Sequence, residues 1–165
     1  MTKPAPSLTL AAAIVALAAL AAIPGARAQD QGAMTKDVIL ARKTMMDSLS
    51  DKMDQIEAMI QTNKIKLDTA NDLADTISIM LMAFPHLFPA SSNQWKPDGN
   101  GDPGTDTFAS PDVWTKFADF YQRANAASKA AFNMSRADKD DALKSLTGEL
   151  RKDCNSCHEA YLKTQ

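Results

Sequence analysis

The chain has 165 residues, of which 45% are hydrophobic and 23% charged, and its formal net charge at pH 7 is −2. This length corresponds to one ordinary domain, and no internal repeat is evident. The mild acidity, together with the lack of a basic cluster, argues against nucleic acid and against an anionic membrane surface as partners.

The N-terminus has the pattern of a cleavable secretory signal. Lys3 precedes an apolar run over residues 8–23, which is shorter than the roughly 20 residues needed to span a bilayer. Ala26-Arg27-Ala28 then has small residues at the two positions that a signal peptidase inspects. We expect cleavage after Ala28 rather than an uncleaved membrane anchor. The mature protein, residues 29–165, is then exported to the periplasm without membrane insertion.

Cleavage would leave a single domain of ordinary size. Removing 28 residues from 165 leaves 137, and the loss of Lys3 and Arg27 reduces the 18 basic side chains to 16 against 20 acidic ones, a formal charge of −4. A domain of this length buries a sufficient core without a disulfide. The two cysteines of the sequence therefore indicate chemistry rather than a structural bridge.

Two amphipathic helices are predicted in the first half of the mature chain. From Thr35 to about Asn63, apolar residues recur at spacings of three, four and seven, which is one helical stripe. A second stripe runs from Leu67 to Phe84, and Pro85 ends it. The following segment, up to residue 110, is rich in Pro, Gly and Asp and is predicted to be one long loop.

Two further helices are predicted in the second half. Ser110-Pro111 has the pattern of an N-cap followed by proline, and it begins a third stripe that includes Phe117 and Tyr121. The segment 135–138, Ser-Arg-Ala-Asp, matches a capping box and predicts the start of a fourth helix that continues to Tyr161. Since no strand pattern competes, we expect an all-α protein, an antiparallel four-helix bundle.

The fourth helix carries the motif that indicates function, "CNSCHEAYLKTQ". Cys154, Cys157 and His158 stand at i, i+3 and i+4, so their side chains share the apolar face of the helix. C-x-x-C-H is the attachment signature of c-type haem. The two sulfurs reach the two vinyl groups on one edge of the porphyrin, while the adjacent imidazole points at the iron. Export agrees with this interpretation, because c-type haem is attached outside the cytoplasm.

Other interpretations of the cysteine pair are weaker. A thioredoxin-like C-x-x-C belongs at the start of a helix after a strand, and here it is at the end of a helix. A structural zinc site needs four ligands, and the further candidate is His86, in a Pro-rich loop. No pattern typical of a hydrolase or a transferase is present, so we expect a protein that is not an enzyme.

With this motif, the sequence resembles the class II c-type cytochromes, namely cytochrome c′ and its low-spin relatives of the cytochrome c-556 type. The resemblance includes "CNSCHEAY", "ARKTMM" in the first helix, "FPHLFPASS" after the second and "ASPDVWTKF" at the third. It implies a four-helix bundle, for which cytochrome c′ is a standard example. It also implies one covalent haem c, with thioether bonds from Cys154 and Cys157 and with His158 as the proximal iron ligand.

The resemblance extends to the surroundings of the haem. It implies that Arg42 lies near a haem propionate, that Met46 faces the iron from the distal side and that Phe88 packs over the haem. One residue departs from the family pattern. Leu162 stands where the family commonly has a basic residue, and Lys163 is the neighbouring basic side chain.

The sixth coordination position separates two functions. A thioether from Met46 would give a six-coordinate, low-spin carrier of single electrons, with redox proteins of the periplasm as partners. An open apolar distal face would give a five-coordinate haem that binds nitric oxide or carbon monoxide. We favour the carrier, although methionine is also a common core residue and Met45 and His86 remain alternative ligands. The resemblance further suggests homodimers built from the first two helices.

Overall fold

The structure, a computed structural model, describes the backbone of residues 24–163 and the side chains from residue 30 onward. The signal segment predicted over residues 1–28 lies largely outside the described residues. The described residues form five α-helices and two short 3-10 helices. Their β-structure is limited to one isolated bridge. In chain order these helices are α1 (Pro24–Gln61), α2 (Leu67–Ala83), η1 (Phe84–Leu87), η2 (Ala90–Ser92), α3 (Asp112–Thr115), α4 (Phe117–Met134) and α5 (Asp140–Tyr161).

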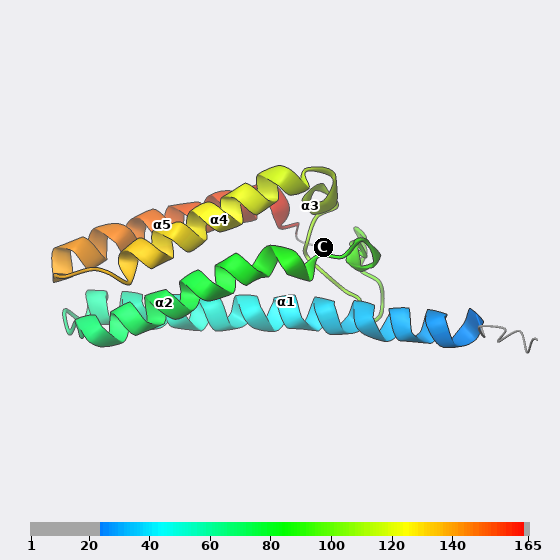
Figure 1. The fold of residues 1–165 in the computed structure, drawn as a ribbon, viewed down its shortest axis with the longest axis horizontal. Coiled ribbons are helices and arrows are strands. Elements are labelled where there is room, and N and C mark those ends of the chain that lie inside the picture. The colour runs from blue at the N-terminus through cyan, green and yellow to red at the C-terminus, as the bar shows by residue number, and fades with distance from the viewer. Residues whose placement is uncertain (1–23, 164–165) are drawn as a thin grey trace, which may run out of the picture.

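The four long helices form the antiparallel four-helix bundle that the sequence predicts (Figure 1). α1 and α2 lie side by side in one layer, and α4 and α5 lie side by side in the other. Short turns join the two helices of each layer, whereas the long connection of residues 84–111 joins the layers at one end of the bundle. None of the described helices is long and apolar enough to cross a membrane.

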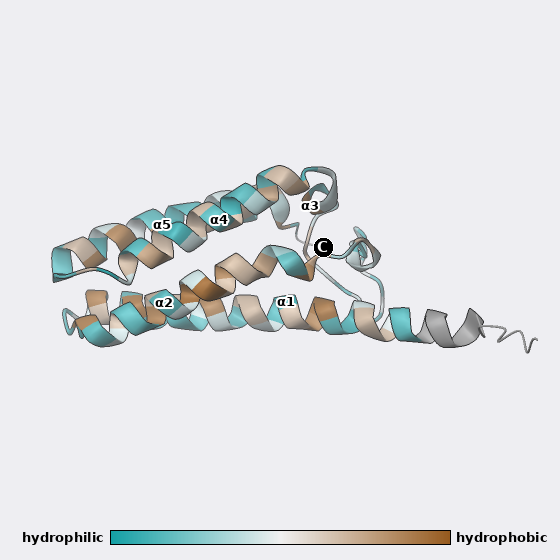
Figure 2. Cartoon of the chain, in the orientation of Figure 1, coloured by the Kyte–Doolittle hydropathy of each residue, from teal (hydrophilic) through white to brown (hydrophobic). Residues whose placement is uncertain are grey.

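The core lies between the two layers. Small residues let α2 and α4 approach closely: Ala70 and Ala74 on α2 and Ala127 and Ala131 on α4 are at most 3% exposed. Figure 2 shows a nearly continuous hydrophobic stretch in the second half of α2, whereas α1, α4 and α5 alternate in hydropathy. This pattern fits one apolar stripe on each helix that faces the core. Larger side chains complete the packing, among them Leu49, Met53, Ile56, Ile77, Leu143 and Leu150.

Three helix boundaries differ from the prediction. α1 already includes the residues before Thr35 and extends back to Pro24, where the described backbone begins. The third stripe is divided into α3 and α4 at Lys116, whose φ of −121° and ψ of 35° interrupt the helix. α5 begins at Asp140, because the hydroxyl of Ser135 donates to the carbonyl of Phe132 at the end of α4 instead of capping the next helix.

The break at Lys116 changes which aromatic residue of α4 is buried. Phe117 and Tyr121, predicted to face the core, are 38% and 37% exposed, whereas Phe120 is 2% exposed. Phe120 contacts Phe88 and Tyr161 with ring centroids 4.8 and 5.3 Å apart. These rings bring α4, the long connection and the end of α5 together at one end of the bundle.

The end of the long connection pairs with the chain segment that leaves α5. The N–H of Ser110 donates to the carbonyl of Tyr161 at 2.9 Å, and the N–H of Lys163 donates to the carbonyl of Phe108 at 2.8 Å. Ala109 and Leu162 form the isolated antiparallel bridge between these two bonds. The last turn of α5, which follows the cysteines, is therefore held against the connection.

Candidate functional site

A cavity of about 440 Å³ lies at this end of the bundle, between α1, α2, α4, α5 and the long connection. Its volume is in the range of small-molecule and cofactor sites, about 300–1,000 Å³. Most of its wall is apolar. The apolar lining includes Met46, Leu49, Met53, Ile77, Leu81, Phe84, Phe88, Val113, Phe120 and Ala124.

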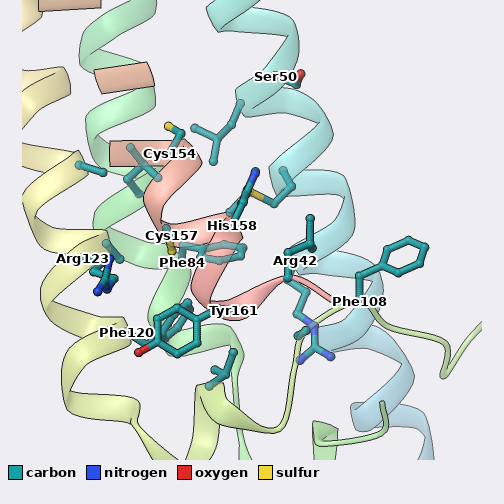
Figure 3. Close-up of a pocket in the computed structure, with 18 of the residues that line it drawn as sticks. Arg42, Ser50, Phe84, Phe108, Phe120, Arg123, Cys154, Cys157, His158 and Tyr161 are labelled. Atoms are coloured by element: carbon teal, nitrogen blue, oxygen red, sulfur yellow. The ribbon is translucent and has the colours of Figure 1, made fainter. Parts of the chain in front are cut away.

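The C-x-x-C-H motif forms one wall of the cavity. Cys154, Cys157 and His158 all line it from the last turns of α5, as their shared helix face requires (Figure 3). Both cysteines are half-buried and unbridged. Burial raises the pKa of Cys154 and raises that of Cys157 to about 11. The thiols are therefore protonated at neutral pH, unlike the low-pKa cysteines of disulfide oxidoreductases.

The two histidines have different surroundings. His158 lines the cavity although part of it is exposed, and burial, followed by the charge of Arg151, lowers its pKa. Its imidazole is therefore neutral at neutral pH, which is the form that binds metals. His86 is exposed on η1, stands edge-on to Tyr121 at 6.1 Å and does not line the cavity. In the described part of the chain, no three His, Cys, Asp or Glu side chains gather as metal ligands.

Arg42 is buried in the cavity wall, where it is 3% exposed. Its guanidinium donates to Ser92 Oγ at 3.0 Å, to the Ser92 carbonyl at 3.1 Å and to Thr107 Oγ1 at 2.7 Å. It also lies 4.8 Å from the centre of the Phe88 ring and 5.6 Å from that of Trp114. These contacts attach the long connection to α1 at two points, Ser92 and Thr107.

The charge of Arg42 has no carboxylate partner among the ion pairs of the described residues. Burial lowers the pKa of this guanidinium to about 10, which shows that its positive charge is disfavoured there. An unpaired buried charge is costly, so the site is suited to an anionic ligand group. Three of the five N–H donors of the guanidinium are used by Ser92 and Thr107, which leaves two for such a group.

The methionines of α1 differ in what they line. Met46 is half-buried and lines the cavity. Met45, the adjacent alternative, lines a separate shallow hollow between α1 and α2 together with Leu40 and Met80. Met53, two turns after Met46, also lines the cavity and is 3% exposed.

Phe88, predicted to pack over the haem, is 8% exposed and lines the cavity. It stands edge-on to Phe84 at 5.1 Å, to Phe120 at 4.8 Å and to Trp114 at 5.8 Å. The indole N–H of Trp114 donates to the Phe88 carbonyl at 3.1 Å. The aromatic cluster therefore holds the connection over this end of the cavity.

Sequence reasoning missed a polar group of α4 beside the motif. Arg123 lines the cavity, and its Nε donates to Asp119 Oδ2 at 2.7 Å. Its Nη1 donates to Ser156 Oγ, also at 2.7 Å. The hydroxyl of Tyr161 donates to the same Asp119 oxygen at 2.6 Å. The i, i+4 spacing of Asp119 and Arg123 could have predicted their ion pair from the sequence. The bond from Arg123 to Ser156 could not be predicted in this way, because the two residues are 33 positions apart.

Comparisons with known proteins agree with this architecture. The model of the family described as Cytochrome C′ matches residues 37–162, and cytochrome c-554 of Cereibacter sphaeroides is 29% identical over 164 residues, 96% of this chain and 97% of the relative. The structure of cytochrome c′ from Thermochromatium tepidum has a TM-score of 0.69 at 18% identity, over 79% of this chain and 97% of that one. A second cytochrome c′ structure, described by an unusual ligand-controlled dimer dissociation, has a TM-score of 0.67 at 17% identity and the same coverage.

At these identities the two solved structures show the fold alone. The family model extends further, because its match runs from α1 to the end of α5 and includes both cysteines and His158. The match covers well over half of the chain. The chain therefore belongs to the cytochrome c′ family, the class II c-type cytochromes.

Proposed function

We propose that this protein is a carrier of single electrons in the periplasm, with one haem c bound through Cys154 and Cys157. The observation that carries the proposal is that both thiols and the imidazole of His158 line one apolar cavity. Haem supplies, when bound, an iron that changes its charge by one, at a potential set by its ligands and surroundings. The mostly apolar lining suits a large apolar cofactor.

Two further features of the cavity fit a haem. The cavity needs an anionic group near Arg42, whose buried charge lacks a carboxylate partner among the described ion pairs and whose guanidinium has two remaining donors. A propionate would supply that charge through strong, charge-assisted hydrogen bonds. Phe84, Phe88 and Phe120, which line the cavity, provide an aromatic, apolar wall against which a porphyrin can pack.

We assign His158 as the proximal ligand and Met46 as the distal ligand. Met46 is favoured over Met45 because Met46 lines the cavity and Met45 lines the separate hollow between α1 and α2. His86 is not favoured, since it is exposed on η1 and outside the cavity lining. A thioether ligand raises the potential of a haem and suits electron transfer.

The second candidate function is a five-coordinate haem that binds nitric oxide or carbon monoxide. It is favoured by the distal wall, where Leu49, Met53 and Ile77 offer an apolar surface to a small gas. For one solved cytochrome c′ of the same fold, the dissociation of the dimer is described as ligand-controlled; this is a property of that protein. In this reading Met46 crowds the iron without binding it.

Carbon monoxide binding by the reduced protein separates the two functions. A bound thioether must dissociate before a gas enters, so the wild type should resist carbon monoxide and Met46→Ala should bind it readily. Met45→Ala is the matched control, because this neighbour lines a different hollow and should behave like the wild type. Ready binding of carbon monoxide by the wild type would contradict the carrier function and support the gas-binding function.

We also propose that the first two helices form a homodimer. Leu40 on α1 and Ile79 and Met82 on α2 are 63%, 56% and 55% exposed, which leaves apolar side chains on the outer surface of this layer. The shallow hollow between α1 and α2 adds Met45 and Met80 to the same layer. Sedimentation of the purified protein tests this assembly, and Ile79→Glu should produce monomers.

A further inference from the structure

Two polar bonds connect the haem-binding turn of α5 to α4. Ser156, which lies between the two cysteines, accepts a hydrogen bond from Nη1 of Arg123 at 2.7 Å. Tyr161, three residues after His158, donates to Asp119 Oδ2 at 2.6 Å, and Nε of Arg123 donates to the same oxygen at 2.7 Å. His158 therefore lies between two tethered residues, and both tethers meet at the Asp119–Arg123 pair.

We propose that Arg123 is a positioning residue of the haem site, which fixes the orientation of the His158 turn and, with Asp119, sets the reduction potential of the iron. This inference rests on the proposed haem site, because the potential and the ligand orientation are properties of the loaded protein. Neither the C-x-x-C-H motif nor the family pattern carried from the sequence includes this residue.

The geometry favours a positioning role. A rotation of the turn about the axis of α5 would move Ser156 and Tyr161 together and would have to break both tethers. Arg123 meets its two partners with different N–H groups of one rigid guanidinium, which lysine cannot reproduce with a single ammonium group. Tyr161 is 5% exposed, so its ring is held by packing as well as by the bond to Asp119.

The charges act on the cavity as well as on the turn. Arg123 lines the cavity from α4, and Figure 3 shows it on the opposite side of the cysteine–histidine segment from Arg42, which comes from α1. Asp119 is ionised, because the hydrogen bonds from Tyr161 and Arg123 lower its pKa. Removing Arg123 leaves a negative charge beside the site, and neutralising Asp119 leaves a positive one.

These two changes should move the reduction potential in opposite directions. A nearby positive charge disfavours the ferric state, so its loss in Arg123→Gln should lower the potential. Asp119→Asn removes a negative charge and should raise it. Loosening of the fold alone would not produce opposite signs. Both side chains are partly exposed, at 37% and 53%, so solvent screening keeps the shifts small.

The experiment uses the mature protein with its haem attached. Potentials are measured by spectroelectrochemical titration, and the hyperfine-shifted methyl signals of the ferric haem report the orientation of the axial ligands. Arg123→Lys keeps the charge and Ser156→Ala removes one tether, so both should alter the methyl shifts more than the potential. The control is Arg136→Gln, since Arg136 pairs loosely with Asp75 at 3.9 Å and does not line the cavity.

Circular dichroism shows whether each variant is folded. If a charge variant does not fold, the milder Ser156→Ala change still tests the positioning role through the haem methyl signals. Opposite shifts of potential, with altered methyl signals in Arg123→Lys and Ser156→Ala, support the inference. Potentials that shift with the same sign in the two charge variants would overturn the inference. So would variants whose potentials and methyl signals equal those of Arg136→Gln. Neither result would affect the proposed haem protein itself. A wild type without covalent haem overturns the proposed function, and this inference with it.

Discussion

Replacing Arg42 by leucine tests whether this buried cation holds the cavity together. The guanidinium bonds to Ser92 and Thr107, which are 50 and 65 residues away in the sequence. Arg42→Leu removes all three bonds and the contacts with the rings of Phe88 and Trp114. The long connection then loses two of its attachments to α1, at Ser92 and at Thr107, while the ion pair of Lys36 with Asp102 and the bond from Lys43 to the Pro103 carbonyl remain.

The expected loss of stability follows from two opposing contributions. Hydrogen bonds from a charged donor contribute about 1.5–3 kcal/mol each, so three bonds give a gross loss of about 4.5–9 kcal/mol. Leucine also removes the burial cost of the charge. Lowering the pKa of Arg42 from 12.5 to about 10 corresponds to roughly 3 kcal/mol of that cost. We expect a net loss of about 3 kcal/mol, and a larger one if a propionate pairs with the guanidinium.

Urea unfolding of the haem-loaded protein, followed by far-ultraviolet circular dichroism, measures this loss. Arg136→Leu is the control, because the Arg136 side chain is 65% exposed and its ion pair spans 3.9 Å. Arg136 also stacks over the exposed Phe132 ring at 4.8 Å, so that change should alter the free energy of unfolding by no more than about 1 kcal/mol. A loss for Arg42→Leu as small as that of the control would refute the structural role of Arg42.

Three other outcomes are expected. The Arg42→Leu change should also lower the reduction potential, because losing a nearby cation stabilises the ferric state, and an unchanged potential in a spectroelectrochemical titration would place Arg42 away from the haem. The mature protein should have no thiol that a thiol reagent can titrate and should keep its haem through acid–acetone extraction; two titratable thiols at Cys154 and Cys157 would contradict covalent attachment. Burial, with the bond to Asp119, raises the pKa of Tyr161 from 10.0 to about 12. The phenol therefore ionises at a lower pH in the unfolded chain than in the folded protein, and the free energy of unfolding should fall as the pH rises through this range. Tyr161→Phe should flatten this pH dependence in urea titrations, and an identical slope would show that another group causes it.

The bundle was predictable because each long helix has its own apolar stripe. Buried apolar residues recur at helical spacing in the sequence wherever a helix is continuous, as it is from Leu49 to Ile56 and from Leu143 to Leu150. Pro85 also marked the end of α2 correctly to within two residues, since the helix ends at Ala83. The C-x-x-C-H motif needs no long-range information, because three side chains on one helix turn face the same way.

The errors have local causes. The stripe of the third helix was counted through Lys116, where the structure interrupts the helix, so Phe117 and Tyr121 were predicted to be buried in place of Phe120. Ser135 has the spacing of a capping box, but its hydroxyl bonds backwards to Phe132. A sequence pattern does not show which of two neighbouring helices such a hydroxyl serves.

The polar parts of the site could not be derived from spacing. The family resemblance suggested a propionate near Arg42, but the burial of its guanidinium depends on oxygens of Ser92 and Thr107. In the same way, Arg123 is an ordinary surface arginine by sequence, and only the packing of α4 against α5 brings it to Ser156. Contacts between distant segments decide these roles.

The near-infrared absorption of the oxidised wild-type protein tests the central claim most directly. Ligation of the iron by His158 and Met46 predicts the weak sulfur-to-iron band of a His/Met haem, together with a sharp low-spin α band after reduction. Met46→Ala should abolish the near-infrared band, whereas Met45→Ala should keep it. A high-spin spectrum of the wild type without the sulfur-to-iron band would contradict the carrier function.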